Sequence, residues 1–101
     1  MRAKIDRIQT RHPDPDKSMP RIERDVYDAF RTAILAVAPP KGEGVPFQDL
    51  PRLVKGQIPA GIHQRIGSVG WYVTTVKLDL EARGEIERIP GSRPQRVRRR
   101  V

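Results

Sequence analysis

The sequence predicts an α+β fold that is mainly α, with three helices, a C-terminal two-stranded hairpin and an extended N-terminal arm. Three observations carry this prediction. Apolar residues recur at helical spacing in three stretches, glycine and proline separate these stretches, and two short runs of alternating character follow the last of them. A chain of 101 residues favours one core. We expect an arm over residues 1–18 and one domain over residues 19–101.

The N-terminal arm is defined by the run from His12 to Ser18, which contains two prolines and two aspartates. Such a run forbids a continuous helix and favours a turn or an extended segment. Two outcomes are open for residues 4–10, a short strand or disorder. Ile5 and Ile8 are among the few apolar groups here, so the arm can pack on its own domain or on a partner subunit.

The first helix is predicted over residues 18–37. Ser18 followed by Pro20 is a start signal, because a proline in the first turn lacks an N–H that would have no helical partner there. The sequence Ala-Pro-Pro at residues 38–40 ends the helix. Its apolar stripe consists of Ile22, Val26, Phe30, Ala33, Ile34 and Val37. This helix should therefore bury one face along most of its length.

A second, short helix is predicted over residues 46–56, with Gly56 as its end signal. Its apolar residues are Phe47, Leu50, Leu53 and Val54. Residues 57–67 contain one proline and two glycines and are predicted to form a connection with about one helical turn.

The third helix is predicted from Ser68, which can cap the first free N–H groups, to Gly84, which ends the helix. The residues expected on its core face are Val69, Tyr72, Val73, Val76 and Leu80. The residues expected on the opposite face are Trp71, Thr74, Thr75 and Leu78. Asp79 and Glu81 are interpreted as solubilising surface acids.

Residues 85–101 are predicted to form the hairpin, with its turn at residues 90–94. The residues expected to face the helices are Ile86, Val97 and Val101. Strand alternation places the other side chains of the second strand on the solvent face, and these are Arg96, Arg98 and Arg100. Three cations in a row are tolerable in water and favourable against a line of phosphates.

The formal charge is +8, and the basic excess lies in the arm and the hairpin. Residues 85–101 hold six basic and two acidic side chains, whereas residues 25–84 hold seven and six. A basic terminus on a small domain favours a polyanionic partner, most often nucleic acid, and the alternative is a solubilising tail. The absence of cysteine excludes disulfides and thiol chemistry. Without a signal peptide or an apolar run of membrane-spanning length, a cytoplasmic location is expected.

No residue pattern is typical of an enzyme, a metal centre or a cofactor site. His12 and His63 lie far apart, and neither has a second ligand at metal-binding spacing. The glycines match neither a phosphate-binding loop nor a dinucleotide fingerprint. We therefore expect a protein that is not an enzyme and that uses no metal and no small-molecule cofactor.

The run from Val76 to Arg88 resembles the last helix and first wing strand of bacterial winged helix proteins, in which a leucine, a charged stretch, a glycine and an apolar residue follow in that order. More narrowly, the chain is similar to a small bacterial family of winged helix proteins with no assigned function. The residues that carry this likeness are Gly70–Trp71, Thr75–Val76, Leu78–Gly84, Tyr27 and Ala36–Pro39. The resemblance implies a three-helix winged helix-turn-helix fold and is nearly silent about activity.

The first functional hypothesis is binding to double-stranded DNA, as in a transcriptional regulator. The residues expected to contact DNA are Arg65, Thr74, Thr75, Lys77, Arg93, Arg96, Arg98 and Arg100. Sequence preference should be weak, because the third helix is electrically neutral and its outer face carries an indole and a leucine.

The alternative hypothesis is a protein-interaction or dimerisation module that binds no DNA. The interface would then consist of Trp71, Leu78, Ile5 and Ile8, with a homodimer as one candidate assembly. Under this reading the arginines serve solubility or an acidic partner.

Overall fold

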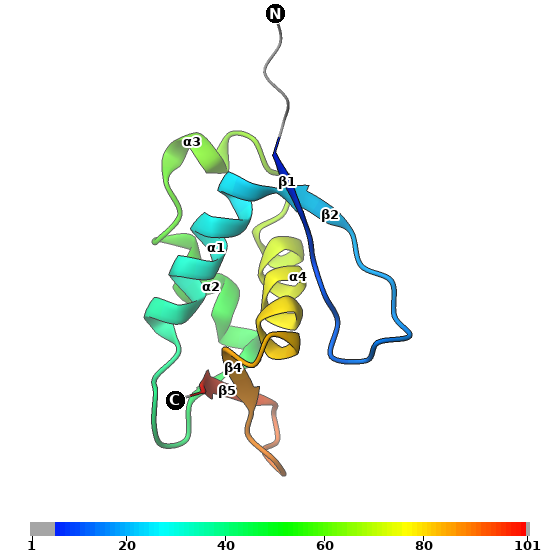
Figure 1. The fold of residues 1–101 in the computed structure, drawn as a ribbon. Helices are drawn as coiled ribbons and strands as arrows, with labels where there is room; N and C mark the ends of the chain where they lie inside the picture. Colours follow the sequence, from blue (N-terminus) through cyan, green and yellow to red (C-terminus); the bar gives the residue numbers. More distant parts are fainter. Residues whose placement is uncertain (1–5, 101) are drawn as a thin grey trace, which may run out of the picture.

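A computed structural model describes residues 6–100 of the protein, and it is an α+β fold with four helices and two small antiparallel sheets in that range (Figure 1). The elements in chain order are β1 (Arg7–Gln9), β2 (Arg21–Glu23), α1 (Arg24–Val37), β3 (Val45–Pro46), a 3-10 turn (Phe47–Asp49), α2 (Leu50–Lys55), α3 (Ala60–His63), α4 (Val69–Ala82), β4 (Ile86–Arg88) and β5 (Arg96–Arg99). No helix among the described residues is long and apolar enough to cross a membrane.

The core lies where α1, α2 and α4 meet above the C-terminal sheet (Figure 1). The apolar side chains there with no exposed surface are Phe30, Ile34, Leu50, Val54, Val73, Val76, Leu80 and Val97. Each such side chain contributes about 1.5–3 kcal/mol through burial. The apolar stripes predicted for the first and third helices are confirmed as faces of this core, with Val37, Val69 and Tyr72 half-buried at its margin.

The predicted start of the first helix at Ser18 is wrong, because α1 begins at Arg24. The preceding residues form β2, which pairs antiparallel with β1 so that Ile8 faces Ile22. The carbonyl of Pro20 accepts the N–H of Thr10 at 3.2 Å, which extends the pairing beyond the strands. The strand expected as one outcome for residues 4–10 is thus present at β1. Ile5 lies outside the described residues.

The segment predicted as one helix over residues 46–56 is divided between β3, the 3-10 turn and α2. The single turn expected in the following connection is α3, which raises the helix count of the described chain from the predicted three to four.

The C-terminal sheet has three strands in the order β3-β5-β4, rather than the predicted two. Val45 of β3 pairs with Val97, which is fully buried as predicted. Gly44, just before β3, has φ +68°, and a Cβ at this position would lie 2.2 Å from the carbonyl oxygen of Val97. A glycine is therefore required for the chain to approach β5. Val101, predicted to face the helices, lies outside the described residues.

Helix α4 lies between the α1–α2 layer and the β1–β2 hairpin, and its C-terminal end rests on the C-terminal sheet (Figure 1). Because other elements pack against several sides of α4, polar side chains of this helix are buried as well as apolar ones. Thr75 and Lys77 are 6% and 2% exposed, and Asp79 is not exposed. The predicted outer position of Thr75 and the interpretation of Asp79 as a surface acid are therefore wrong.

Candidate nucleic-acid interface

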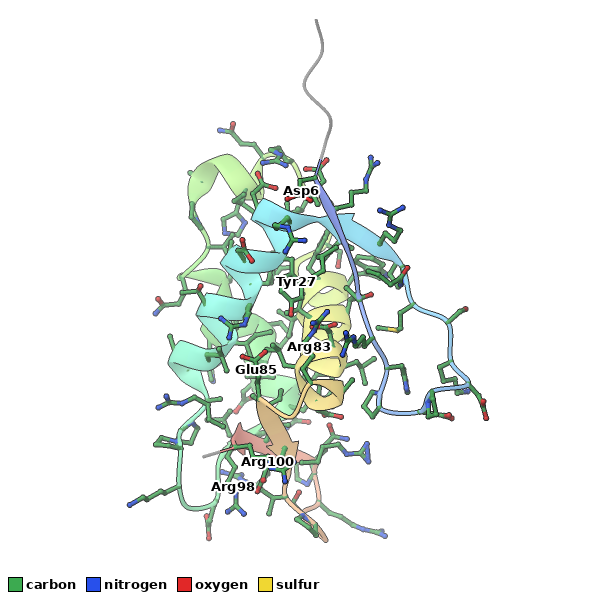
Figure 2. All side chains as sticks on the ribbon, in the orientation of Figure 1. Asp6, Tyr27, Arg83, Glu85, Arg98 and Arg100 are labelled. Atoms are coloured by element: carbon green, nitrogen blue, oxygen red, sulfur yellow. The ribbon has the colours of Figure 1, made fainter. Side chains whose placement is uncertain are left out.

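Asp79 joins α4 to α1 and to the N-terminal loop formed by residues 10–20. Its Oδ1 accepts the backbone N–H of Arg11 at 2.8 Å, and its Oδ2 accepts Nε of Arg83 at 2.8 Å and the hydroxyl of Tyr27. Figure 2 shows Tyr27 and Arg83 between α1 and α4. Burial and the hydrogen bond to Asp79 raise the pKa of Tyr27 above its ordinary value. This cluster is a structural anchor, closed to any ligand.

Lys77 joins α4 to the C-terminal sheet and is not available to DNA. Its Nζ donates to Oε1 of Gln95 at 2.7 Å and forms an ion pair with Glu81. It also lies 4.6 Å from the ring centroid of Phe47. Burial lowers the pKa of Lys77, and Glu81 opposes this shift. Lys77 and Thr75 are both too buried to contact a duplex in this conformation.

Arg96 and Arg98 extend from one side of β5, as alternation predicts, but both guanidinium groups hold the loop before β3. Arg96 donates to the carbonyls of Glu43 at 2.7 Å and Gly44 at 3.0 Å. Arg98 donates to the carbonyl of Gly42 and pairs with Glu87, each at 2.9 Å. The loop that folds back over these arginines is remote in sequence, which is why strand alternation alone did not reveal their role.

Arg93 and Arg100 are exposed and form no ion pair among the described residues. Arg88, which was not predicted as a site residue, has the same properties. Arg88 and Arg100 line one wall of a groove of about 470 Å³, and His12 and Pro13 line the other. Leu78 of α4 also lines this groove. Arg88 and Arg100 therefore border a groove beside α4, whereas Arg93 lines a separate hollow at the turn between β4 and β5.

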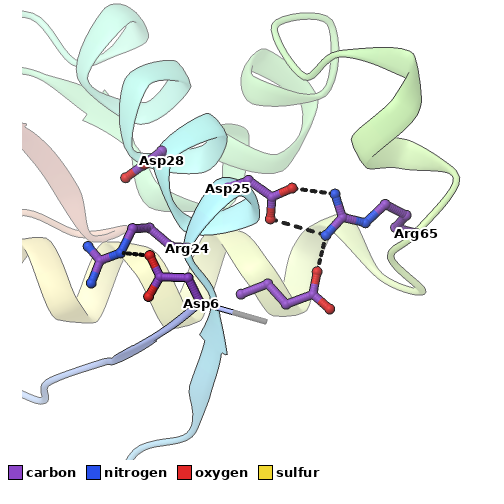
Figure 3. A pocket seen from close by; sticks show the side chains of 6 residues that line it. Asp6, Arg24, Asp25, Asp28 and Arg65 are labelled. Carbon is purple, nitrogen blue, oxygen red and sulfur yellow. Dashed lines mark hydrogen bonds and ion pairs between the residues drawn. The ribbon is translucent and has the colours of Figure 1, made fainter. Parts of the chain in front are cut away.

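Arg65 lies at the other end of the molecule from the C-terminal sheet, next to the start of α1. Figure 3 shows its guanidinium paired with Asp25 and with a second carboxylate, that of Glu23. The surrounding pocket of about 460 Å³ also holds Asp6 and Asp28. An acidic environment of this kind repels phosphate. The structure does not bring Arg65 together with the other predicted DNA contacts.

Trp71 is 47% exposed and is the exposed large hydrophobic residue of the described chain. Its ring contacts Tyr72 edge-on, with centroids 4.8 Å apart, and Thr74 is exposed one turn further along α4. Leu78 is half-buried in the groove, and Ile8 packs against the core. Of the predicted interface residues that the structure describes, Trp71 is thus the exposed one, and Leu78 and Ile8 are half-buried.

A comparison with protein-family models matches residues 7–97 to a family described as a family of unknown function, DUF6958. The chain belongs to this family. The range shared with DUF6958 begins with β1 and ends within β5, so it includes both the N-terminal hairpin and the C-terminal sheet. Neither a search of curated proteins nor a search of solved structures finds a match.

Sequence reasoning missed three exposed cations of this DUF6958 member: Arg88, which lines the groove, and Arg11 and Lys17, which line a second hollow beside α4. A signal for Arg88 was present, since it precedes the turn of a basic hairpin. For Arg11 and Lys17 the one signal was the basic excess of the arm, and their place depends on the contact of the N-terminal loop with α4. Among residues 6–100, no group of three or more histidine, cysteine, aspartate or glutamate side chains is arranged to hold a metal ion.

Proposed function

We propose that the protein binds double-stranded DNA as a winged helix protein, with β4, β5 and their turn as the wing. The order of elements supports this proposal. A helix, a short strand, two further helix-forming segments, the long helix α4 and a hairpin follow one another, and the short strand β3 pairs with the hairpin. In winged helix proteins this order presents one helix and the hairpin to the duplex.

The observation that carries the proposal is the exposure of Arg88 and Arg100 beside α4 and of Arg93 in the turn between β4 and β5, each without an ion pair in the described structure. Most other acidic and basic groups of the wing neutralise one another or bond to the backbone, as Arg98 does with Glu87. Unpaired cations on a projection are placed to meet phosphates.

The expected binding is dominated by phosphate contacts and has weak sequence preference. Of the polar residues predicted on α4 to approach the duplex, only Thr74 is exposed. Three phosphate contacts give a slope of log K against log salt of roughly −2.7, or about a 40-fold loss of affinity between 50 and 200 mM salt.

The test is fluorescence anisotropy of a labelled mixed-sequence duplex at several salt concentrations. The informative wing variant is Arg93→Gln with Arg100→Gln, because changing Arg96 or Arg98 would release the loop at residues 42–44. We expect the wing variant to reduce the magnitude of the salt slope by about 1.8. The matched control, Arg52→Gln with Lys55→Gln on α2, removes the same charge and should keep the wild-type slope. Absence of salt-dependent binding by the wild type would overturn the proposal.

A second candidate function, binding to a protein partner without DNA, is favoured by the exposed indole of Trp71. Trp71 emission should then shift to shorter wavelength as protein concentration rises, and sedimentation should detect a dimer that Trp71→Ser abolishes. A monomer with concentration-independent emission would remove the homodimer form of this candidate.

A further inference from the structure

A hollow of about 530 Å³ lies between the N-terminal loop and the last turn of α4. We call it the loop hollow. The side chains relevant to its chemistry are those of Arg11, His12, Lys17 and Ser18, and Ala82 of α4 closes its inner side. No carboxylate is among the described residues that line it. Its polar lining thus combines two cations with a hydroxyl and an imidazole, which are groups that bind phosphate oxygens.

The cations of the loop hollow are free for a ligand. Arg11 and Lys17 are exposed, and neither side chain forms an ion pair within residues 6–100. The nearest buried acid, Asp79, is already paired with Arg83. Asp14 and Asp16 belong to the same loop but do not line the hollow. The local field in the hollow is therefore positive.

The loop around the hollow is held in place by contacts of its backbone. The N–H of Arg11 donates to Asp79 at 2.8 Å, and Nε2 of Gln9 donates to the carbonyl of Met19 at 2.7 Å. The N–H of Lys17 donates to the carbonyl of Asp14 at 3.1 Å. Neither the Arg11 nor the Lys17 side chain takes part in these bonds. The backbone of the loop therefore places Arg11 and Lys17 beside the hollow, and neither side chain has an ion-pair partner among the described residues.

The loop hollow is a neighbour of the groove that borders the wing. His12 lines both, and the far wall of the groove holds Arg88 and Arg100. Of the acids in the groove, Glu81 pairs with Lys77 and Glu87 with Arg98, which leaves Asp14. Cations thus border one surface from the loop to the wing, along the side of α4.

We propose that the loop hollow is a second phosphate-binding subsite, which takes a backbone phosphate of the DNA strand that also contacts Arg100. The inference rests on the proposed DNA binding and adds the N-terminal loop as a second basic projection beside α4. A competing role exists for the same residues, because cations near a helix C-terminus stabilise the helix dipole. Arg11 and Lys17 would then affect stability and leave DNA affinity unchanged.

The experiment compares three double variants that each remove two positive charges. They are Arg11→Gln with Lys17→Gln at the loop hollow, Arg93→Gln with Arg100→Gln at the wing, and Arg52→Gln with Lys55→Gln on α2. Duplex affinity is measured between 50 and 200 mM salt, and thermal unfolding is recorded in parallel. Because the subsite takes one phosphate, the loop-hollow variant should bind on the order of tenfold more weakly at 0.1 M salt, with the magnitude of the slope reduced by about 0.9. The charge-preserving variant, Arg11→Lys with Lys17→Arg, should retain binding.

The outcomes separate the two proposals. If the wing variant weakens binding and the loop-hollow variant keeps the wild-type affinity and slope, the second subsite is overturned and DNA binding stands. A lowered melting temperature with unchanged affinity would also overturn it in favour of the helix-dipole role. If the wild type does not bind the duplex at 50 mM salt, both proposals fail.

Discussion

Two ion pairs of α4 begin two residues apart and hold different parts of the molecule: Lys77 with Glu81, and Asp79 with Arg83. Each spans one helical turn, the spacing at which side chains of a helix meet. The Asp79 pair fastens the N-terminal loop and α1, whereas the Lys77 pair fastens the C-terminal sheet through Gln95. One helix thus positions both projections that we propose to contact DNA.

The two anchors differ in which charged group is shielded from water: the acid is the fully buried group in the Asp79 pair, whose Arg83 is 25% exposed, and the ammonium is the more buried group in the Lys77 pair. The Asp79 carboxylate has no exposed surface and accepts hydrogen bonds from three donors. The Lys77 ammonium is nearly as buried, but its partner Glu81 is 8% exposed and lines the groove. Oε1 of Glu81 is buried beside Lys77, but the Glu81 side chain lines the groove, so its carboxylate can turn towards solvent when Lys77 is removed. Two ion pairs with the same spacing and the same charges can therefore contribute different amounts to the free energy of unfolding.

The largest effect is expected from Asp79→Asn. The amide keeps the shape but leaves the buried side of Arg83 and the hydroxyl of Tyr27 without their charged acceptor, so the free energy of unfolding should fall by about 3 kcal/mol. Urea denaturation measures this change. Hydrogen exchange should then speed up in residues 7–23 more than in residues 86–99.

The matched control is Asp28→Asn, an exposed acid of α1 with no ion pair in the described structure. It should change stability by less than about 0.5 kcal/mol. Equal losses for the two aspartates would show that the buried cluster does not anchor the loop.

The sequence predicted the apolar faces of the fold well, because periodicity depends only on local spacing. Val73, Val76 and Leu80 were placed on the core side of α4, and Val97 on the inner side of β5. The start of α1 was predicted too early, because Ile22 fits the helical stripe and also faces Ile8 across a strand pair. Local spacing cannot decide between these two arrangements.

The candidate site was predicted less well, because its polar contacts join residues far apart in the sequence. Asp79 looks like a solubilising acid until the N–H of Arg11, 68 residues earlier, is placed beside it. Arg96 looks free until the carbonyl of Glu43 is placed beside it. Charge counts located the basic C-terminal hairpin, and only tertiary contacts separate its structural arginines, Arg96 and Arg98, from Arg93 and Arg100.

A smaller effect is expected from Lys77→Met, which keeps the length of the side chain and its contact with Phe47. The loss of the ion pair should lower the free energy of unfolding by about 2 kcal/mol, because the Glu81 carboxylate, whose Oε1 is buried beside Lys77, can then turn into the groove that Glu81 lines. Hydrogen exchange should speed up mainly in residues 86–99, the reverse of the Asp79→Asn pattern. Lys55→Met, on the exposed side of α2, is the control and should be nearly neutral.

The pH dependence of the Lys77 anchor follows from its lowered pKa. Burial lowers the pKa of Lys77 below 10.5, the ordinary value. The unfolded chain therefore binds more protons between these two pKa values, and stability rises with pH as 10.5 is approached. The stability difference between wild type and Lys77→Met should widen over this range in urea titrations. A constant difference would mean that Lys77 is solvated in the folded state.

The smallest effect is expected from Tyr27→Phe, which removes one donor from Asp79 and should cost about 1.5 kcal/mol at neutral pH. The pKa of Tyr27 is raised from 10.0 by burial and by its bond to Asp79. Because the folded state holds this proton more tightly, the Tyr27 contribution is complete below pH 10 and declines as pH rises above 10. The stability difference between wild type and Tyr27→Phe should thus narrow at high pH, opposite in sign to the Lys77 effect.

Tyr72→Phe, at the tyrosine stacked 5.4 Å from Phe30, supplies the control. If the stability difference from wild type narrowed equally at high pH for Tyr27→Phe and Tyr72→Phe, the effect could not be assigned to the hydrogen bond between Tyr27 and Asp79.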